Sequence, residues 1–317
     1  MKKIVMYVEP DWAFGSVHYE LMKRLYQYGF DCQLLSWNQG YSVEEIIELD
    51  YNTDIWLTTP HGYRYLKYVY DAIEPERCVV VAHASIDIDE LKFYNCLDDF
   101  NRFKSYGVVS EFLKFHSINS GIARIPVSCP VGINFNNFYS KPSEELKIIG
   151  FAGAYRDPSD TITTSITDVS DLFKIHLSKK RGYLVEQCAS TVNLEYKIAN
   201  AYHHSYVTMG GFYKSVDCVI IPSSEEGAGL PALEAGAAGK LVIGAEVGHW
   251  KQRIGDKGGV IVPIDEQSFK SQTTEVLNFY KNNPSSYRKK CSEIQEHART
   301  YDWEHVIHHW INILNTQ

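Results

Sequence analysis

Two glutamates, Glu226 and Glu234, flank a glycine-containing stretch between two apolar segments. The stretch reads Glu-Gly-Ala-Gly-Leu-Pro-Ala-Leu-Glu, so seven residues separate the two carboxylates. Gly227 and Gly229 permit a tight turn in which backbone N–H groups approach a ligand closely. Pro231 suits the first position of a helix, where the missing N–H costs nothing. Because the start of a helix is positive and has free N–H groups, the pattern predicts an anion site.

The two carboxylates make such an anion site unusual. Carboxylates repel phosphate, but they accept hydrogen bonds from hydroxyl groups. A site that combines amide N–H groups with two carboxylates therefore fits a sugar nucleotide, with one glutamate for the sugar and the other for the ribose. The alternative interpretation is a buried strand–helix–strand crossover whose two glutamates face solvent. Spacing alone leaves both interpretations open.

Short apolar runs recur along the chain between polar or glycine-containing segments. This pattern is typical of parallel strands that are covered by helices, and it predicts an α/β fold. The strands are expected at residues 3–8, 31–37, 55–59, 78–82 and 106–110, and then at 147–152, 191–198, 206–209, 218–222, 241–244 and 258–263.

Composition limits the class of protein. The 317 residues suffice for two domains, and the 44% hydrophobic and 22% charged content is typical of a globular protein. The net charge of −8 argues against a broad nucleic-acid or membrane footprint. The seven cysteines are scattered, as expected for reduced thiols. No apolar run reaches the roughly 18 residues of a membrane span, and the first strand begins near the N-terminus, so we expect a cytoplasmic protein without membrane insertion.

The segment from Glu226 to Glu234, preceded by Asp217 and Pro222, resembles the signature of the retaining GT-B glycosyltransferases of family 4, also called glycosyl transferases group 1. The family usually has an aromatic residue where this chain has Ala228. The resemblance implies the GT-B fold, in which two Rossmann-like domains face a cleft and the C-terminal helix crosses back to the first domain. It implies an acceptor-side domain at 1–140, with the returning helix 301–317, and a nucleotide-sugar donor domain at 141–300.

The resemblance also implies roles for individual residues. Glu226 would orient the donor sugar and Glu234 would hold the ribose. In the first domain, Gly15 would let the backbone approach the donor, and His83 would contact the donor sugar; a packed or surface histidine is the alternative. The remaining donor-binding positions of the signature are Gly227, Ala228, Gly229 and Leu230.

In the family, an arginine and a lysine that precedes a glycine clamp the diphosphate and offset its growing charge. Arg156 is the candidate for the first cation. The second is ambiguous, because Arg181 stands directly before Gly182 and Lys180 comes one residue earlier. Either side chain could serve, and a solvated helix face is the alternative for both.

Asp87 and Asp89 form an Asp-x-Asp pair. Such a pair binds a divalent ion in the other glycosyltransferase architecture, GT-A. The pair leads into a helical segment, however, and both carboxylates could simply lie at the start of that helix.

The resemblance implies transfer of a glycosyl group from a nucleotide sugar, with a UDP-sugar favoured, to an acceptor with retention of configuration. The family needs no metal, so we expect no cofactor and no metal site. The acceptor is undetermined among glycans, lipids, proteins and small molecules, and the acidic charge makes DNA less expected. The alternatives are a non-catalytic nucleotide-sugar-binding subunit and a GT-B-shaped nucleotide-sugar epimerase; the paired glutamates favour transfer.

Overall fold

The chain forms two compact units, comprising Met1–Gly132 with Trp303–Gln317 and Ile133–Asp302. The computed structural model describes residues 1–8, 13–60, 63–153, 166–199, 206–247, 250 and 254–316. The expected boundary at residue 140 lies inside the second unit, because Phe135 and Phe138 pack into the core of that unit.

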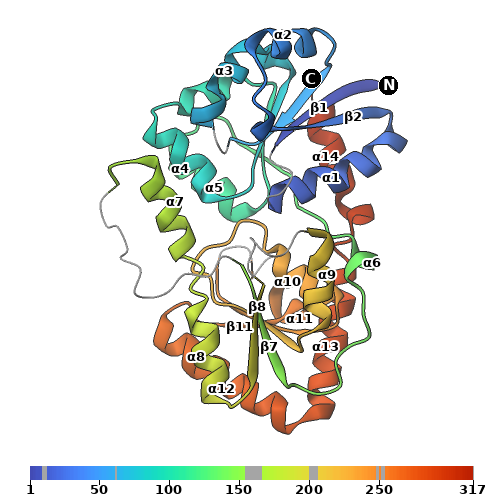
Figure 1. Ribbon diagram of the computed structural model, residues 1–317, viewed down its shortest axis with the longest axis vertical. Helices are drawn as coiled ribbons and strands as arrows, with labels where there is room; N and C mark the ends of the chain where they lie inside the picture. Colours follow the sequence, from blue (N-terminus) through green and yellow to red (C-terminus); the bar gives the residue numbers. More distant parts are fainter. Residues whose placement is uncertain are drawn as a thin grey trace. The chain divides into compact units, whose positions relative to one another are not determined.

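The first unit is built on a parallel sheet with the strand order β2-β1-β3-β4-β5-β6 (Figure 1). Its inner strands are continuously buried, which explains their uninterrupted apolar sequences. The strands are β1 (Lys2–Val8), β2 (Phe30–Ser36), β3 (Ile55–Thr58), β4 (Cys78–Ala82), β5 (Ser105–Val108) and β6 (Val127–Ser128).

Helices cover this sheet in two groups. Helix α1 contacts α14, whereas α2, α3, α4 and α5 contact one another in chain order. The last helix, α14, therefore belongs to the first unit, although 170 residues of the second unit precede it in the chain. The helices are α1 (Ala13–Leu25), α2 (Val43–Tyr51), α3 (Tyr63–Ala72), α4 (Ser85–Phe93), α5 (Glu111–Asn119) and α14 (Trp303–Asn315), with 3₁₀ turns η1 (Tyr26–Tyr28), η2 (Trp37–Gln39), η3 (Pro75–Arg77) and η4 (Leu97–Arg102).

The second unit contains a parallel sheet with the strand order β11-β10-β9-β7-β8. Strands β9 and β10 are buried along their whole length. Both units are thus parallel α/β sheets of the Rossmann type, as predicted. The strands are β7 (Ile148–Ala152), β8 (Glu195–Ala199), β9 (Cys218–Ile221), β10 (Leu241–Ala245) and β11 (Val260–Val262).

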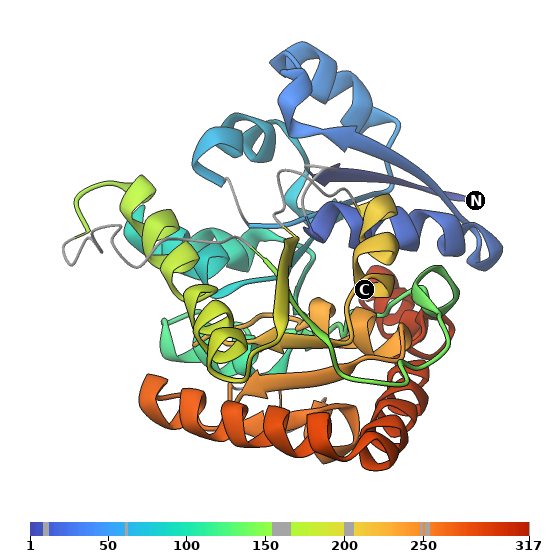
Figure 2. The same cartoon turned by 60° about the horizontal axis from the view of Figure 1, so that its bottom comes forward.

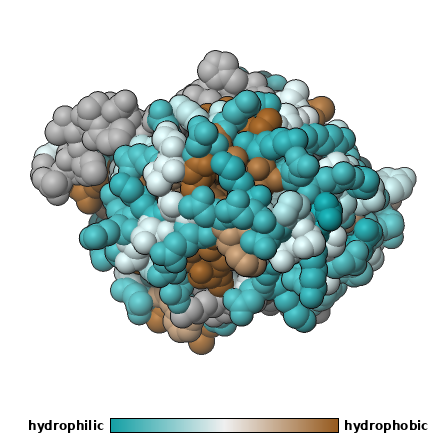
Figure 3. All heavy atoms as spheres, turned by 90° about the horizontal axis from the view of Figure 1, so that it is seen from below, coloured by the Kyte–Doolittle hydropathy of each residue, from teal (hydrophilic) through white to brown (hydrophobic). Residues whose placement is uncertain are grey.

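The helices of the second unit turn apolar stripes toward its sheet. Helix α12 contacts α8 and β11, and α13 contacts α10 and β10; Figure 2 shows α12 and α13, in orange and red, beside the sheet. The surface seen from below is mainly hydrophilic (Figure 3). The helices are α6 (Phe135–Phe138), α7 (Val169–Ser178), α8 (Tyr183–Thr191), α9 (Tyr206–Lys214), α10 (Leu230–Ala237), α11 (Gly255–Gly258), α12 (Glu266–Asn282) and α13 (Pro284–Arg299).

One predicted strand is wrong. Residues 206–209 begin helix α9 rather than forming a strand. The local sequence is rich in residues that favour strands, but Gly210 and Tyr213, which lie three residues apart on one helix face, are both buried. Packing on this face outweighs the local propensity.

Gly244 offers a test of the packing in the second unit. A Cβ at this position would lie 2.3 Å from the Cη2 atom of Trp250, whose side chain is fully buried. We expect Gly244→Ala to lower the free energy of unfolding of this unit by about 1–3 kcal/mol, because the core cannot take the extra methyl group.

Gly211→Ala is the matched control for this prediction. Gly211 is exposed on α9, and an added Cβ there meets no atom within 4 Å. Since alanine favours helices over glycine, this substitution should raise the stability slightly. Urea unfolding of both variants measures the difference, and equal stabilities would contradict the packing described for Gly244.

Candidate functional site

The signature loop, defined here as residues 222–229, joins the carboxyl end of β9 to the start of α10. Gly229 caps α10 with a left-handed φ of 64°, a conformation that favours glycine. Pro231 lies in the first turn of α10, where its missing N–H is not needed. The loop therefore presents the free N–H groups of a helix start at one edge of the sheet.

The strand order places this loop where ligands bind in open parallel sheets. Strand β8 lies on one side of β7 and β9 lies on the other, so the order reverses between β7 and β9. Ligands bind outside the carboxyl ends of the strands at such a reversal. The signature loop follows β9 at this point. Arg156 follows β7 in the chain and lies outside the described residues.

Lys180 and Glu226 form an ion pair at the signature loop. The Lys180 Nζ lies 2.7 Å from the Glu226 Oε1, and the two side chains are 21% and 10% exposed. A cation and a carboxylate thus stand together beside the positive start of α10. Partial burial strengthens their attraction relative to that of a surface pair.

The residues around this pair bring two short segments together. We call residues 179–181 the basic turn; it follows helix α7. The Lys179 Nζ lies 2.7 Å from the Glu225 Oε2, and the Ser224 N–H donates to the Lys179 carbonyl over 2.8 Å. The basic turn therefore packs against the signature loop and is not a solvated helix face. The pairing of Lys179 with Glu225 is not predictable from the sequence, in which the matching runs of charge are its only signal.

Arg181 differs from its two neighbours. Its Nε donates to the Pro222 carbonyl over 2.7 Å, and its Nη1 donates to the Ile264 carbonyl over 2.6 Å. Burial lowers the pKa of this guanidinium from its usual value. Of the two candidates for the family lysine, the structure brings Lys180 to Glu226 and directs Arg181 to backbone carbonyls.

Glu234 lies in α10 and is buried, at 7% exposure. Its Oε2 accepts a hydrogen bond from the Tyr213 hydroxyl over 2.8 Å. Burial raises the pKa of Glu234 to about 7, and the hydrogen bond from Tyr213 opposes that rise. The carboxyl group is therefore not a solvent-facing one, and it is partly protonated near neutral pH. The sequence does not predict Tyr213 as this partner, because the pattern around it does not predict helix α9.

The other signature positions lie at the same edge of the sheet. Gly227 and Ala228 are half-buried in the loop, and Leu230 is the first residue of α10 and packs against the core. Together with Gly229 they form the turn from β9 into α10. Their predicted contacts with a donor stay predictions.

In the first unit, Gly15 lies in the first turn of α1 and His83 directly follows β4. The His83 ring packs near His18 and Trp310, at centroid distances of 5.6 and 6.2 Å. Burial, with a contribution from His18, lowers the pKa of His83 to about 3, so its imidazole is neutral near pH 7. His18, which lies one helical turn after Gly15, is a neighbour of His83 that the sequence does not predict.

Asp87 and Asp89 have separate partners. The Asp87 Oδ2 accepts from the backbone N–H groups of His83 and Ala84, at 2.6 and 2.9 Å, and so caps α4. The Asp89 Oδ1 lies 2.8 Å from the His116 Nε2. Within the described part of the chain, no three His, Cys, Asp or Glu side chains gather as metal ligands would. No helix in that part is both long and apolar enough to span a membrane.

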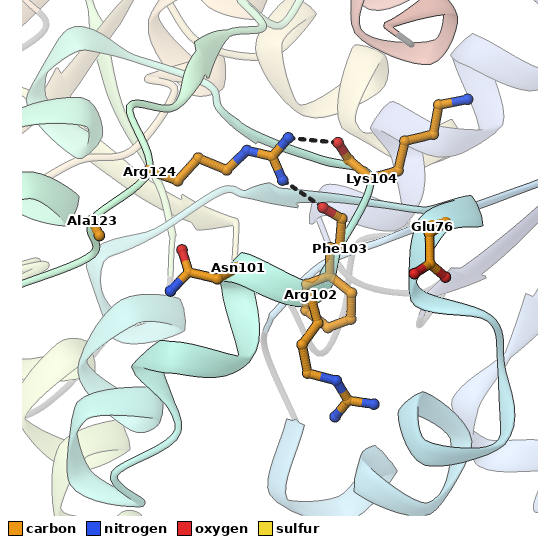
Figure 4. A pocket seen from close by; sticks show the side chains of 7 residues that line it. All are labelled: Glu76, Asn101, Arg102, Phe103, Lys104, Ala123 and Arg124. Carbon is orange, nitrogen blue, oxygen red and sulfur yellow. Dashed lines mark hydrogen bonds between the residues drawn. The ribbon is translucent and has the colours of Figure 1, made fainter.

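The first unit has a pocket beside the amino ends of its strands, at the edge of the sheet opposite to the carboxyl ends that His83 follows. It is lined by residues before the amino ends of β4, β5 and β6, including Glu76, Arg102, Lys104 and Arg124. The Arg124 guanidinium donates to the carbonyls of Phe103 and Lys104, and the side chains of Arg102 and Lys104 extend away from each other (Figure 4). Because its charged groups do not converge and ligands bind at carboxyl ends, we assign no ligand to it.

Comparison with known proteins bears on this site. Residues 147–278 match the profile of the family described as "Glycosyl transferases group 1". The matched segment contains the signature loop, the basic turn and Glu234. No curated protein sequence is significantly similar to the chain.

Solved structures share the fold over the whole chain. Sucrose-phosphate synthase from Thermosynechococcus elongatus has a TM-score of 0.69 at 12% identity, covering 98% of both chains. HepE of Anabaena in complex with UDP and glucose has a TM-score of 0.67 at 13% identity, covering 100% of both chains. An alpha-glucosyltransferase in complex with UDP and a 13-mer DNA has a TM-score of 0.67 at 12% identity, covering 98% of this chain and 99% of that one. The fold is GT-B, as predicted, and together with the family match it supports a glycosyltransferase of the GT-B type.

Proposed function

We propose that the protein transfers a glycosyl group from a UDP-sugar to an acceptor, with retention of configuration and without a metal ion. The ion pair of Lys180 with Glu226 beside the start of α10 carries the proposal. Lys180 and the free N–H groups at the start of α10 can bind the diphosphate, and the Glu226 carboxylate beside them can accept hydrogen bonds from sugar hydroxyls. The paired carboxylates favour sugar transfer over simple phosphate binding.

Each residue of the site has a role in the proposed reaction. The bond between the anomeric carbon and the diphosphate oxygen breaks, and the acceptor oxygen bonds to the same face of that carbon. The acceptor proton passes to the leaving phosphate oxygen. Lys180, Arg156 and the N–H groups of α10 offset the charge that grows on the diphosphate. Glu226 orients the sugar and Glu234 holds the ribose.

The choice of UDP follows the structural relatives. The HepE structures contain UDP, UDP with glucose, or UDP-glucose, and the alpha-glucosyltransferase structure contains UDP. The acceptor is a glycan, lipid, protein or small molecule, and the acidic net charge of −8 disfavours DNA. The roles predicted for Gly15 and His83 on the first unit are part of this proposal.

Binding of UDP is the direct test. UDP at about 100 times its dissociation constant should stabilise the protein by about 2.7 kcal/mol, which is a shift of a few degrees in Tm. The shift should be equal with and without EDTA, because Lys180 and backbone N–H groups offset the negative charge of the diphosphate in place of a metal ion. Differential scanning fluorimetry with UDP, GDP and ADP measures it.

The outcomes separate the possible functions. A shift that requires Mg²⁺ or Mn²⁺ would contradict the metal-free site, and no shift with any nucleotide would contradict the donor site. When UDP binds, incubation with UDP-glucose distinguishes a transferase, which slowly transfers glucose to water and releases UDP, from an epimerase, which yields a new UDP-sugar. Binding without either product from any UDP-sugar tested would favour a non-catalytic subunit.

A further inference from the structure

We propose that Arg181 is a positioning residue, which holds the basic turn and the signature loop together, and that it does not bind the donor diphosphate. The inference rests on the proposed function, because it concerns the same donor site. It goes further by separating the two adjacent cations, Lys180 and Arg181, into different roles.

The backbone at Arg181 is the first observation. Arg181 has a φ of 48°, which lies in the left-handed region that side chains other than glycine rarely adopt. The residue lies between helices α7 and α8, and its carbonyl accepts from the Leu184 N–H over 3.0 Å. Such a conformation persists only where the surroundings hold it.

The guanidinium supplies that restraint. Pro222 directly follows β9 and Ile264 follows β11, and β10 lies between these two strands in the sheet. Through its hydrogen bonds to both carbonyls, Arg181 connects the ends of two strands that are not neighbours. The planar guanidinium suits two acceptors in fixed directions, whereas a lysine ammonium does not reproduce that geometry.

Little of the guanidinium remains for a ligand. The Nη2 atom is buried and has no hydrogen-bond partner in the part of the chain that the structure describes. A phosphate in solvent does not reach a buried nitrogen. The Phe269 ring lies on the same group, with its centroid 5.8 Å from the Cζ atom. Packing and carbonyl contacts thus occupy Arg181, whereas the Lys180 ammonium lies against the Glu226 carboxylate.

Arg181 restrains the proposed donor site because it follows Lys180 in the chain and bonds to the first residue of the signature loop. Arg181 fixes the residue after Lys180, and through Pro222 it fixes the first residue of the signature loop. Both ends of the Lys180–Glu226 pair are therefore restrained by one side chain. Loss of this restraint would leave every charge of the donor site present but would allow the two segments to separate.

The experiment compares Arg181→Lys, which keeps the charge, with Lys180→Gln, which removes a charge but keeps Arg181. Arg181→Gln removes a charge, as Lys180→Gln does, and should nevertheless behave as Arg181→Lys does. Lys174→Gln is the control, because Lys174 is a half-exposed lysine of α7 that pairs with Asp171 over 3.1 Å. Binding of UDP and of uridine, turnover of UDP-glucose, and hydrogen exchange of the amides of residues 223–229 without ligand are measured for each.

In Arg181→Lys we expect about tenfold faster exchange of these amides and about tenfold lower kcat for UDP-glucose, with the ratio of UDP to uridine affinity unchanged. In Lys180→Gln we expect that ratio to fall about tenfold while the exchange stays as in the wild type. Lys174→Gln should match the wild type throughout.

Two results would overturn the inference. One is wild-type exchange and turnover in Arg181→Lys, which would mean that charge alone matters. The other is a fall in the UDP-to-uridine ratio equal to that of Lys180→Gln, which would make Arg181 a phosphate ligand. The exchange measurement needs no nucleotide, so it decides the inference even if the wild type binds no UDP and the proposed function fails.

Discussion

Glu226→Gln should lower the kcat for UDP-glucose turnover by about 100-fold, a loss of about 2.7 kcal/mol of transition-state stabilisation. The substitution keeps the shape of the side chain and removes its charge. The carboxylate pairs with Lys180 over 2.7 Å, so its loss also frees that ammonium for the diphosphate. We therefore expect UDP to bind as tightly as in the wild type or several-fold more tightly.

Steady-state turnover and isothermal titration calorimetry measure these two effects separately. Lys180→Gln should act in the opposite sense on binding, because it removes the cation and leaves Glu226 to repel phosphate. Glu275→Gln, at an exposed position of α12, is the control and should change neither quantity. A Glu226→Gln variant with weaker UDP binding and unchanged kcat would show that Glu226 supports binding only, contrary to its proposed role.

Glu234→Gln should stabilise the protein at pH 8 and leave it nearly unchanged at pH 4. Burial raises the pKa of Glu234 to about 7 from an ordinary value of 4.5. Between these two values the folded state binds more protons than the unfolded state, so stability falls as the pH rises through this window. Above about pH 7 the full cost of ionising the buried carboxyl is present, at most about 3 kcal/mol.

Glutamine removes this cost because it is never charged, and its carbonyl can still accept from the Tyr213 hydroxyl. The Tm difference between variant and wild type, measured from pH 4 to pH 8, should therefore grow with pH by several degrees. A difference that does not change with pH would contradict a raised pKa at Glu234. Glu275→Gln should show no such trend, since that side chain is exposed.

The same variant tests the proposed role of Glu234 at the ribose. If the carboxylate accepts hydrogen bonds from ribose hydroxyls, Glu234→Gln should weaken UDP binding by about 1.5–3 kcal/mol. The variant would then be more stable and less able to bind. Unchanged UDP affinity would remove the ribose from the proposed role and leave Glu234 as a buried structural carboxyl.

The sequence predicts much of this arrangement because its strands are short apolar runs and its signature is local. Strand β9, the turn at Gly229 and the helix start at Pro231 follow one another in the chain, so neighbouring residues specify them. The strand order that places this turn at a reversal of the sheet is also expected for Rossmann-type units. The position of the proposed donor site is therefore predictable from the sequence.

The contacts that act over long distances in sequence were not readable. Whether Lys180 or Arg181 pairs with Glu226 depends on the left-handed backbone at Arg181 and on the carbonyl of Ile264, neither of which leaves a local signal. Residues 206–209 favour strands locally and so predict one, whereas burial places them in the first turn of helix α9. For the same reason the sequence does not predict the hydrogen bond of Glu234 to Tyr213, which lies on α9.

The membership of α14 in the first unit has a consequence for synthesis on the ribosome. Domains usually fold in the order in which they emerge, the N-terminal one first. Here Trp310, which is fully buried and donates to the Pro130 carbonyl over 2.9 Å, is translated after the whole second unit. The first unit thus cannot complete its core until α14 has been translated, and the second unit is expected to complete its fold before it.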